Sequence, residues 1–205
     1  MLSPFYIESG IEAGCDEAGR GCLAGPVFAA AVILPKSFKS DLLNDSKKIK
    51  EADRYYLRKE IEKHAISYGV AMLDHLEIDH YNILNASIRS MHKALDKLDK
   101  TPSRILVDGN KFIPYKEIEF HCMIKGDGRF YSIAAASILA KTYRDDFMKE
   151  LHELHPYYNW QKNKGYPTEE HRRAIIEHGP CEYHRKSFQL YPAAYQSSLF
   201  NESKS

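Results

Sequence analysis

Several features that would mark a secreted, zinc-binding or disulfide-stapled protein are scarce in this sequence. Its 205 residues contain only 4 cysteines and 1 tryptophan. The cysteines are scattered and form no C-x-x-C pair, which argues against a zinc site and against a disulfide framework. We therefore expect reduced thiols at Cys15, Cys22, Cys122 and Cys181.

Long apolar runs and an excess of charge of one sign are also missing. No segment approaches the length of a membrane span, and the N-terminus lacks the basic-then-apolar pattern of a signal peptide, so we expect a cytoplasmic protein. The formal net charge is +1, so any nucleic-acid affinity must come from local basic loops. The length suits one domain, which we expect over residues 1–192, with a flexible tail over 193–205 and a monomeric state.

What the sequence does contain is an alternation of short apolar runs and amphipathic segments. Together these patterns predict an α/β fold. The run 27–34 is apolar at every position, which is typical of a strand that packs on both faces. Strands are expected over residues 11–16, 27–34, 65–73, 104–107 and 118–124, and helices over 53–64, 82–98, 131–154 and from Thr168 to Gly179-Pro180.

Three of the expected strands lead into acidic residues. Asp16 and Glu17 precede Gly19-Arg20-Gly21, Asp108 precedes Gly109, and Asp127 lies between two glycines. Neighbouring strand residues face opposite sides of a sheet, so Asp16 and Glu17 share a site only if the backbone bends at the glycines. Acids at separate strand ends of an open sheet can converge, which we favour. The alternative is that each acid caps its own loop, and this alternative is strongest for Asp127.

A converged cluster of these four acids would need cations to stay ionised at neutral pH. Hard divalent ions such as Mg²⁺ and Mn²⁺ prefer carboxylate oxygens. Two such ions about 4 Å apart, one activating water and one stabilising the leaving oxygen, carry out phosphodiester hydrolysis. The acids therefore favour a two-metal hydrolase of phosphodiesters.

Five segments spread along nearly the whole chain carry a family signature. They are GCDEAGRGCLAGPV from Gly14, LNDSKK over 43–48, LVDGN over 106–110, KGD over 125–127 with SIAAASILAKTYRD over 132–145, and KGYPT over 164–168. Together and in this order they resemble bacterial ribonuclease HII. In this family the position of Cys22 is more often proline, and the difference loosens the loop without touching an expected ligand.

The resemblance implies a ribonuclease H-like mixed sheet flanked by helices, with a helical C-terminal segment. It also implies an endoribonuclease that cuts the RNA strand of RNA/DNA hybrids and incises 5′ to single ribonucleotides in duplex DNA, leaving 3′-hydroxyl and 5′-phosphate ends. Two Mg²⁺ or Mn²⁺ ions would be held by Asp16, Glu17, Asp108 and Asp127. Asp145 is the alternative to Asp127, and we do not expect it to be a ligand.

The same resemblance assigns substrate contacts. Gly19, Arg20 and Gly21 would read the 2′-hydroxyl that distinguishes RNA from DNA, and Tyr166 would pack against the next deoxyribose. The residues themselves indicate phosphate contacts in three basic loops, because each pairs positive charge with a small hydrogen-bonding residue, which positions a duplex without reading its sequence. These loops are at Ser46-Lys47, at 162–164 and at Arg185, and any one of them alone could instead be a solvated charged face. Near the C-terminus, Gln196, Leu199 and Phe200 resemble the short peptides that dock bacterial replication proteins on the sliding clamp, although a tail without this function is an equal alternative.

Other functional classes stay open at this stage. A non-catalytic nucleic-acid binding module would need only the basic loops, and a nucleotide-phosphate enzyme would use the glycine loop on free nucleotides. Within the ribonucleases H, the runner-up is the HIII type, which usually carries an additional N-terminal domain and another residue after the first glycine of the loop. Arg20 and the short segment before Asp16 favour HII.

Overall fold

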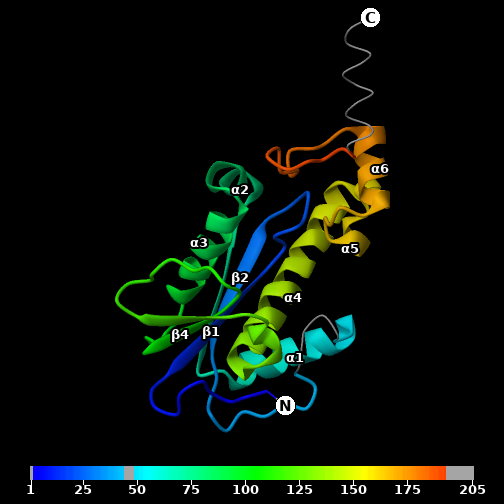
Figure 1. The fold of residues 1–205 in the computed structure, drawn as a ribbon. Coiled ribbons are helices and arrows are strands. Elements are labelled where there is room, and N and C mark those ends of the chain that lie inside the picture. Colours follow the sequence, from blue (N-terminus) through cyan, green and yellow to red (C-terminus); the bar gives the residue numbers. More distant parts are fainter. Residues whose placement is uncertain (1, 44–48, 193–205) are drawn as a thin grey trace, which may run out of the picture.

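The computed structural model of this chain describes residues 2–43 and 49–192. They form a five-stranded sheet with helices packed against it (Figure 1). The strand order is β3-β2-β1-β4-β5. Strand β2 pairs antiparallel with both β3 and β1, whereas β4 pairs parallel with both β1 and β5. These pairings confirm the expected mixed sheet. The strands are β1 (Glu12–Ala18), β2 (Val27–Ile33), β3 (Ser67–Leu73), β4 (Arg104–Asp108) and β5 (Glu119–Met123).

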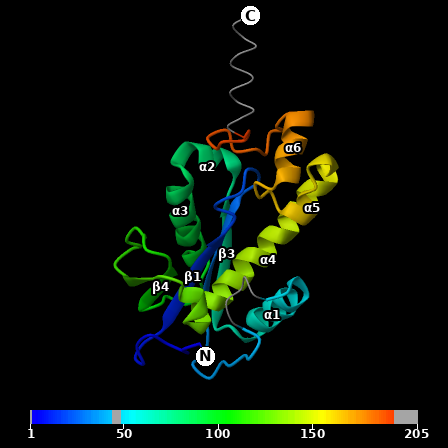
Figure 2. The same cartoon turned by 45° about the vertical axis from the view of Figure 1, so that its right-hand side comes forward.

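Helices cover both faces of the sheet (Figure 2). The long helix α4 crosses one face together with α1, and α3 packs on the other face next to α2. None of the helices in the described part of the chain is long and apolar enough to span a membrane. The helices are α1 (Glu51–His64), α2 (His75–Tyr81), α3 (Ile83–Leu95), α4 (Tyr131–Leu154), α5 (Trp160–Asn163) and α6 (Glu169–His178), with short 3₁₀ turns η1 (Gly126–Gly128) and η2 (Pro156–Tyr158).

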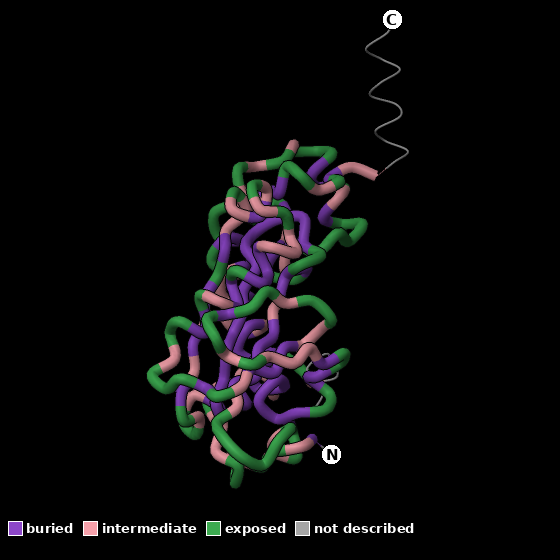
Figure 3. The backbone as a smooth tube through the Cα atoms, turned by 60° about the vertical axis from the view of Figure 1, so that its left-hand side comes forward, coloured by how far each residue is buried: buried purple, intermediate pink, exposed green. Residues whose placement is uncertain are grey.

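The interior strand β2 is buried along its whole length, as its unbroken apolar sequence predicts. Figure 3 shows buried segments gathered in the interior of the molecule. The residues of β2 alternate between the two faces because successive strand side chains point in opposite directions. Ala30 and Val32 pack toward α4, and Ala29, Ala31 and Ile33 pack toward α3. The sheet therefore has one core on each side.

Helix α4 lies unusually close to the sheet because small residues line the contact. Its first half is nearly all alanine, serine and isoleucine, and a side chain at Gly14 of β1 would collide with the backbone of Ser132. This close approach brings the second and third turns of α4 over the end of β1. As described below, that end carries Asp16.

The C-terminal helices form a smaller cluster on the far end of α4 (Figure 1). Tyr158 and Trp160 are buried there against Met148 and Leu151 of α4. These two aromatic residues therefore cover the long helix and are not free to stack on bases. The described cysteines are unpaired, as expected from their spacing.

Candidate metal centre and glycine loop

Two of the expected acids come from neighbouring parallel strands. The register pairs Cys15 of β1 with Val107 of β4, so the next residues, Asp16 and Asp108, end up side by side at the carboxyl end of both strands. Asp16 is part of β1 and pairs with Ala30 of β2. The strand was expected to end at Asp16, and it continues for two more residues to Ala18. The side chain of Asp16 is buried and faces α4.

Asp127 reaches the same place from the turn between β5 and α4. The 3₁₀ turn η1 carries it, and the amide of Gly126 donates a 2.7 Å hydrogen bond to Oδ1 of Asp108. This bond ties the turn to the end of β4. As a result, Asp16, Asp108 and Asp127 each offer a carboxylate oxygen within 4.8 Å of the others.

Glu17 lies at the edge of this group. The strand continues through Ala18, so Glu17 points to the opposite face from Asp16 and is not among the three acids whose oxygens cluster. It still lines the same cavity, and its Oε1 lies 3.2 Å from Nη1 of Arg20. The cavity is lined by Asp16, Glu17, Ala18, Gly19, Arg20, Gly21, Asp108, Asp127, Lys141 and Tyr166.

Burial and mutual repulsion shift the titration of these acids. Burial raises the pKa of Asp16 well above its usual range, and the adjacent Glu17 carboxyl raises it further, while the Lys141 ammonium lowers it. Burial also raises the pKa of Glu17, and the Arg20 guanidinium opposes that rise. Burial, and after it the neighbouring carboxyl groups, thus disfavour the ionised forms of these acids when no cation is bound.

Two side chains of α4 join the site although the sequence patterns gave them no role. Lys141 donates a 2.6 Å hydrogen bond to Ser137, one turn earlier, and both act on Asp16. A signal was present, because Lys141 is the first charged residue after the apolar and small stretch 132–140 and faces the same way as Ser137. It marks the point where the helix leaves the core and reaches the site.

Asp145, the alternative ligand, lies elsewhere. It makes a 3.6 Å ion pair with Arg54 and lines a second cavity. That cavity shares Ala18, Gly19, Lys141 and Tyr166 with the acidic one. It adds the cationic residues Arg54, Arg144, Lys162 and Lys164. A basic hollow thus adjoins the acidic hollow.

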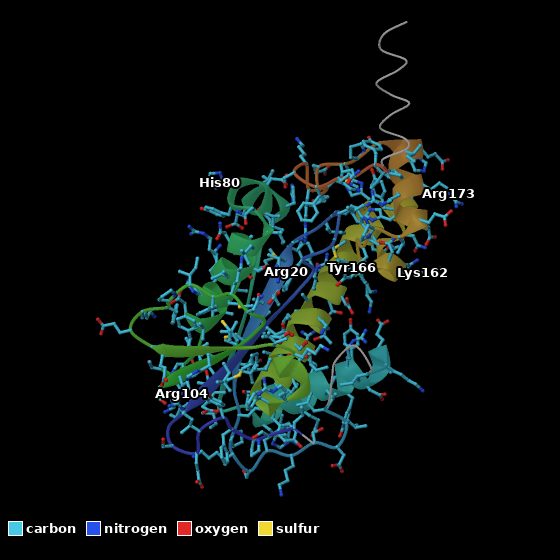
Figure 4. The ribbon with its side chains drawn as sticks, viewed as in Figure 1. Arg20, His80, Arg104, Lys162, Tyr166 and Arg173 are labelled. Carbon is cyan, nitrogen blue, oxygen red and sulfur yellow. The ribbon has the colours of Figure 1, made fainter. Side chains whose placement is uncertain are left out.

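The glycine loop, residues 19–26, borders both cavities together with Tyr166. Gly19 has φ +95°, a backbone conformation that favours glycine. Tyr166 is 46% exposed, and its segment is joined to the loop by a 2.8 Å bond from the Leu23 amide to the Gly165 carbonyl. Figure 4 shows the labelled Arg20, Tyr166 and Lys162 along this same side of the molecule.

Arg185 is placed differently from the expectation that it contacts phosphate. Its side chain is fully buried, and its guanidinium donates to the backbone carbonyls of Gly19, Arg20, Gly25 and Pro26. Because its donors already bind the loop, we correct the assignment from phosphate contact to support of the loop. Of the other expected phosphate contacts, Lys162 and Lys164 line the second cavity, whereas Ser46 and Lys47 lie outside the described residues, as do the tail residues Gln196, Leu199 and Phe200.

A second group of ligating atoms lies at the C-terminal end of α4. His155, Cys181 and Glu182 bring a ring nitrogen, a thiol and a carboxylate within 4.8 Å of one another. The spacing of the cysteines argued against a zinc site. It could not predict this group, because His155 and Cys181 are far apart in the sequence and only the fold brings them together. The group shares no lining residue with the acidic cavity.

Comparison with known proteins agrees with this geometry. The family model "Ribonuclease HII" matches residues 13–191. A protein from Bacteroides thetaiotaomicron named ribonuclease HII is 59% identical over 190 residues, which cover 93% of this chain and 95% of that protein. One of the same name from Christiangramia forsetii is 61% identical over 188 residues, with 92% and 95% covered.

Solved structures share the fold at lower identity. Ribonuclease H2 from Pyrococcus horikoshii superimposes with a TM-score of 0.76 at 23% identity, covering 94% of this chain and 99% of the other. Ribonuclease HII from Archaeoglobus fulgidus, solved in complex with PCNA, gives 0.69 at 23% identity, with 91% and 99% covered. Bst-RNase HIII in complex with Mn²⁺ gives 0.69 at 19% identity, with 100% and 74% covered. From the matched family model and these relatives, the chain belongs to the ribonuclease HII family.

Proposed function

We propose that this endoribonuclease cuts the RNA strand of RNA/DNA hybrids and incises on the 5′ side of single ribonucleotides in duplex DNA, leaving 3′-hydroxyl and 5′-phosphate ends. One observation supports this most directly. Three buried or half-buried aspartates with oxygens within 4.8 Å adjoin a glycine loop and an exposed tyrosine on one continuous surface. Hydrolysis and recognition of the sugar would therefore take place next to each other.

The donor set fits two Mg²⁺ or Mn²⁺ ions. Asp16, Asp108 and Asp127 would hold them, with Glu17 at the edge, because all offered atoms are carboxylate oxygens. Bound ions lower the pKa of a coordinated water and stabilise negative charge on the leaving oxygen. The pKa of Asp16 is raised by burial and, second, by the Glu17 carboxyl. Bound cations would favour the ionised carboxylate against both effects.

The remaining residues would hold the duplex. Backbone groups of Gly19, Arg20 and Gly21 would meet the 2′-hydroxyl, because a loop without bulky side chains lets a strand approach closely. Tyr166 would pack on the following deoxyribose. Lys162 and Lys164 in the neighbouring basic hollow would contact phosphates, which hold a strand without selecting its sequence.

The decisive assay uses duplex DNA with a single ribonucleotide, beside all-DNA and RNA/DNA hybrid duplexes, with Mg²⁺ or Mn²⁺. We expect incision next to the ribonucleotide, cleavage of the hybrid and none of the all-DNA duplex. Asp108→Asn should lower the rate about 10³-fold or more, since it removes a carboxylate from the ion site. Incision by Asp108→Asn at the wild-type rate, or none by the wild type, would refute the proposal; the second result would leave a binding module.

We also propose that the C-terminal tail docks on a sliding clamp through Gln196, Leu199 and Phe200, since apolar anchors on a short peptide can occupy a partner's pocket. The PCNA complex of the Archaeoglobus fulgidus relative supports this. Truncation after Tyr195 should abolish clamp binding in a pull-down and leave hydrolysis intact. We further propose that residues 1–192 act as one catalytic domain, in a monomer that works in the cytoplasm.

A further inference from the structure

Two buried arginines support the glycine loop from beneath. Arg144 on α4 donates from Nε to the Pro26 carbonyl at 2.9 Å and from Nη2 to the Ala24 carbonyl at 3.2 Å. Arg185 donates to the carbonyls of Gly19, Arg20, Gly25 and Pro26 at 2.7–3.2 Å. The two residues are 2% and 0% exposed, so their guanidiniums serve mainly the protein's own carbonyls, with Arg144 also forming part of the wall of the basic hollow.

This arrangement determines which way the loop amides point. Every peptide bond in the described ranges 2–43 and 49–192 is trans, and in a trans peptide the N–H points away from the preceding carbonyl. Because Arg185 binds the carbonyls of Gly19 and Arg20 from the inside, the amides of Arg20 and Gly21 point outward. The acidic cavity lies on that outer side, since both residues line it.

Gly19 is adapted to the same arginines. A side chain there would overlap Nε of Arg144, so any larger residue would displace the guanidinium. The positive φ of Gly19 adds a second reason for glycine at this position. Loop and arginine therefore fit together as one packed unit.

Arg144 also connects the loop to Tyr166. Its Nη1 donates to the Lys164 carbonyl at 2.8 Å, two residues before the tyrosine. The Leu23 amide donates to Gly165 at 2.8 Å, and a side chain at Gly165 would come within 2.8 Å of the Ala24 carbonyl. One guanidinium thus bonds to both segments that we assign to reading the sugar.

We propose that Arg144 and Arg185 are positioning residues that hold the glycine loop and the Tyr166 segment in the geometry that reads a ribonucleotide. The inference rests on the proposed function. A planar guanidinium can bind several carbonyls at fixed angles, whereas a lysine ammonium is a single point with flexible donors. Replacing a guanidinium by an ammonium should therefore loosen the glycine loop and the Tyr166 segment, while the acidic residues and the net charge stay unchanged.

The test replaces each arginine by lysine, which keeps the charge. For Arg144→Lys and Arg185→Lys we expect kcat/KM for a single-ribonucleotide duplex to fall about tenfold or more. The inhibition constant of an all-DNA competitor and the Mn²⁺ affinity should stay within about twofold, because phosphate contacts and ligands are unchanged. A merely structural role would not separate these three quantities.

Arg172→Lys is the matched control. Arg172 donates to the carbonyls of Gln189 and Leu190, away from the loop, and its lysine variant should keep the wild-type kcat/KM. Lysine variants that retain kcat/KM would overturn the role of the two arginines. A wild type that does not incise at the ribonucleotide would instead overturn the proposed function.

Hydrogen exchange of the wild-type protein tests the geometry without any variant. With metal removed by a chelator, the amides of Leu23 and Gly25 should exchange as slowly as the core, since both are bonded within the protein. Those of Arg20 and Gly21 should exchange rapidly and become protected by a single-ribonucleotide duplex but not by all-DNA duplex. Rapid exchange at Leu23 and Gly25, or no such difference between duplexes, would contradict the proposal.

Discussion

Asp16 shows how a single residue can serve function at a cost to stability. It occupies a buried position in β1, where Cys15 before it and Ala18 two residues after it are also buried. Burial and the neighbouring Glu17 and Asp108 carboxyls raise its pKa, so the ionised form is strained in the metal-free protein. Functional sites commonly carry such unfavourable groups, and removing them stabilises a protein.

Asp108→Asn should therefore stabilise the metal-free protein while weakening metal binding. The asparagine oxygen can still accept the Gly126 amide bond, and one negative charge next to Asp16 and Glu17 is lost. We expect the free energy of unfolding at pH 7 to rise by about 1 kcal/mol, or about 2–4 °C in Tm. Thermal unfolding with and without Mn²⁺ measures both effects, because an ion that binds the folded state raises Tm.

Asp96→Asn provides the control for this prediction. Asp96 accepts a 2.6 Å bond from the Tyr115 hydroxyl, which holds the pKa of its carboxyl below the usual range. Its neutralisation should therefore bring no gain in stability. If Asp108→Asn lowers the Tm of the metal-free protein, repulsion among the acidic residues does not measurably destabilise the folded state.

At the residue scale, the sequence predicts the acidic residues of the site better than the buried residues that hold the neighbouring glycine loop. Asp16 and Asp108 could be expected to meet because both follow apolar strands, and adjacent strand ends bring such residues together. The inward turn of Arg185 could not be expected, because a cation between histidine and lysine is typical of an exposed basic loop. Only the fold reveals that the glycine loop passes directly over it.

At the level of elements, apolar periodicity predicts all five strands and the main helices to within a few residues. Helix α4 was expected over 131–154 and spans Tyr131–Leu154. Helix α2 was missed, although Asp74 and Glu77 form a capping box at its start. Its seven residues are too few for a periodic stripe, and the short α5 was missed for the same reason.

The turn η1 gives a prediction at this scale, because it is the element that delivers Asp127. A side chain on Gly126 would come within 2.6 Å of Cδ1 of Ile133 and 3.0 Å of Cβ of Met123. Gly126→Ala should therefore shift the turn, lower the free energy of unfolding by about 1–3 kcal/mol and weaken Mn²⁺ binding. Urea unfolding and calorimetric titration with Mn²⁺ measure these changes.

Gly128→Ala is a close control, since a side chain there meets nothing within 4 Å. It should leave both quantities near wild type. Adding Ile133→Val to Gly126→Ala removes the methyl group that collides and should restore part of the loss. Equal effects of the two alanine substitutions would show that packing under η1 does not position Asp127.

For the whole molecule, the order of strands and the docking of the C-terminal segment depend on long-range contacts that local patterns do not contain. A buried pair of histidines illustrates this. His171 of α6 binds the Tyr166 carbonyl through Nδ1 at 2.9 Å, so its Nε2 accepts from Trp160 at 2.9 Å and from His184 at 3.2 Å. The His184 Nδ1 accepts the Cys181 amide at 3.1 Å. All these bonds require both rings to be neutral.

This pair predicts loss of stability in acid. Burial, with smaller contributions from His171, His155 and His75, lowers the pKa of His184 to about 3, and burial lowers that of His171. Between pH 6.5 and 3 the unfolded chain binds more protons than the folded protein, so the free energy of unfolding falls as the pH falls. The contribution of neutral His184 is complete above pH 6.5, and about 2 kcal/mol of it is lost at pH 5. The raised pKa values of Asp16, Glu17 and Asp145 have the opposite effect, because they stabilise the folded protein as the pH falls. The contribution of His184 is therefore isolated by comparing the wild type with His184→Gln, which keeps these acids. Urea unfolding, followed by the fluorescence of Trp160, should give a shallower pH dependence in the variant, and identical slopes would show that His184 is not the titrating group.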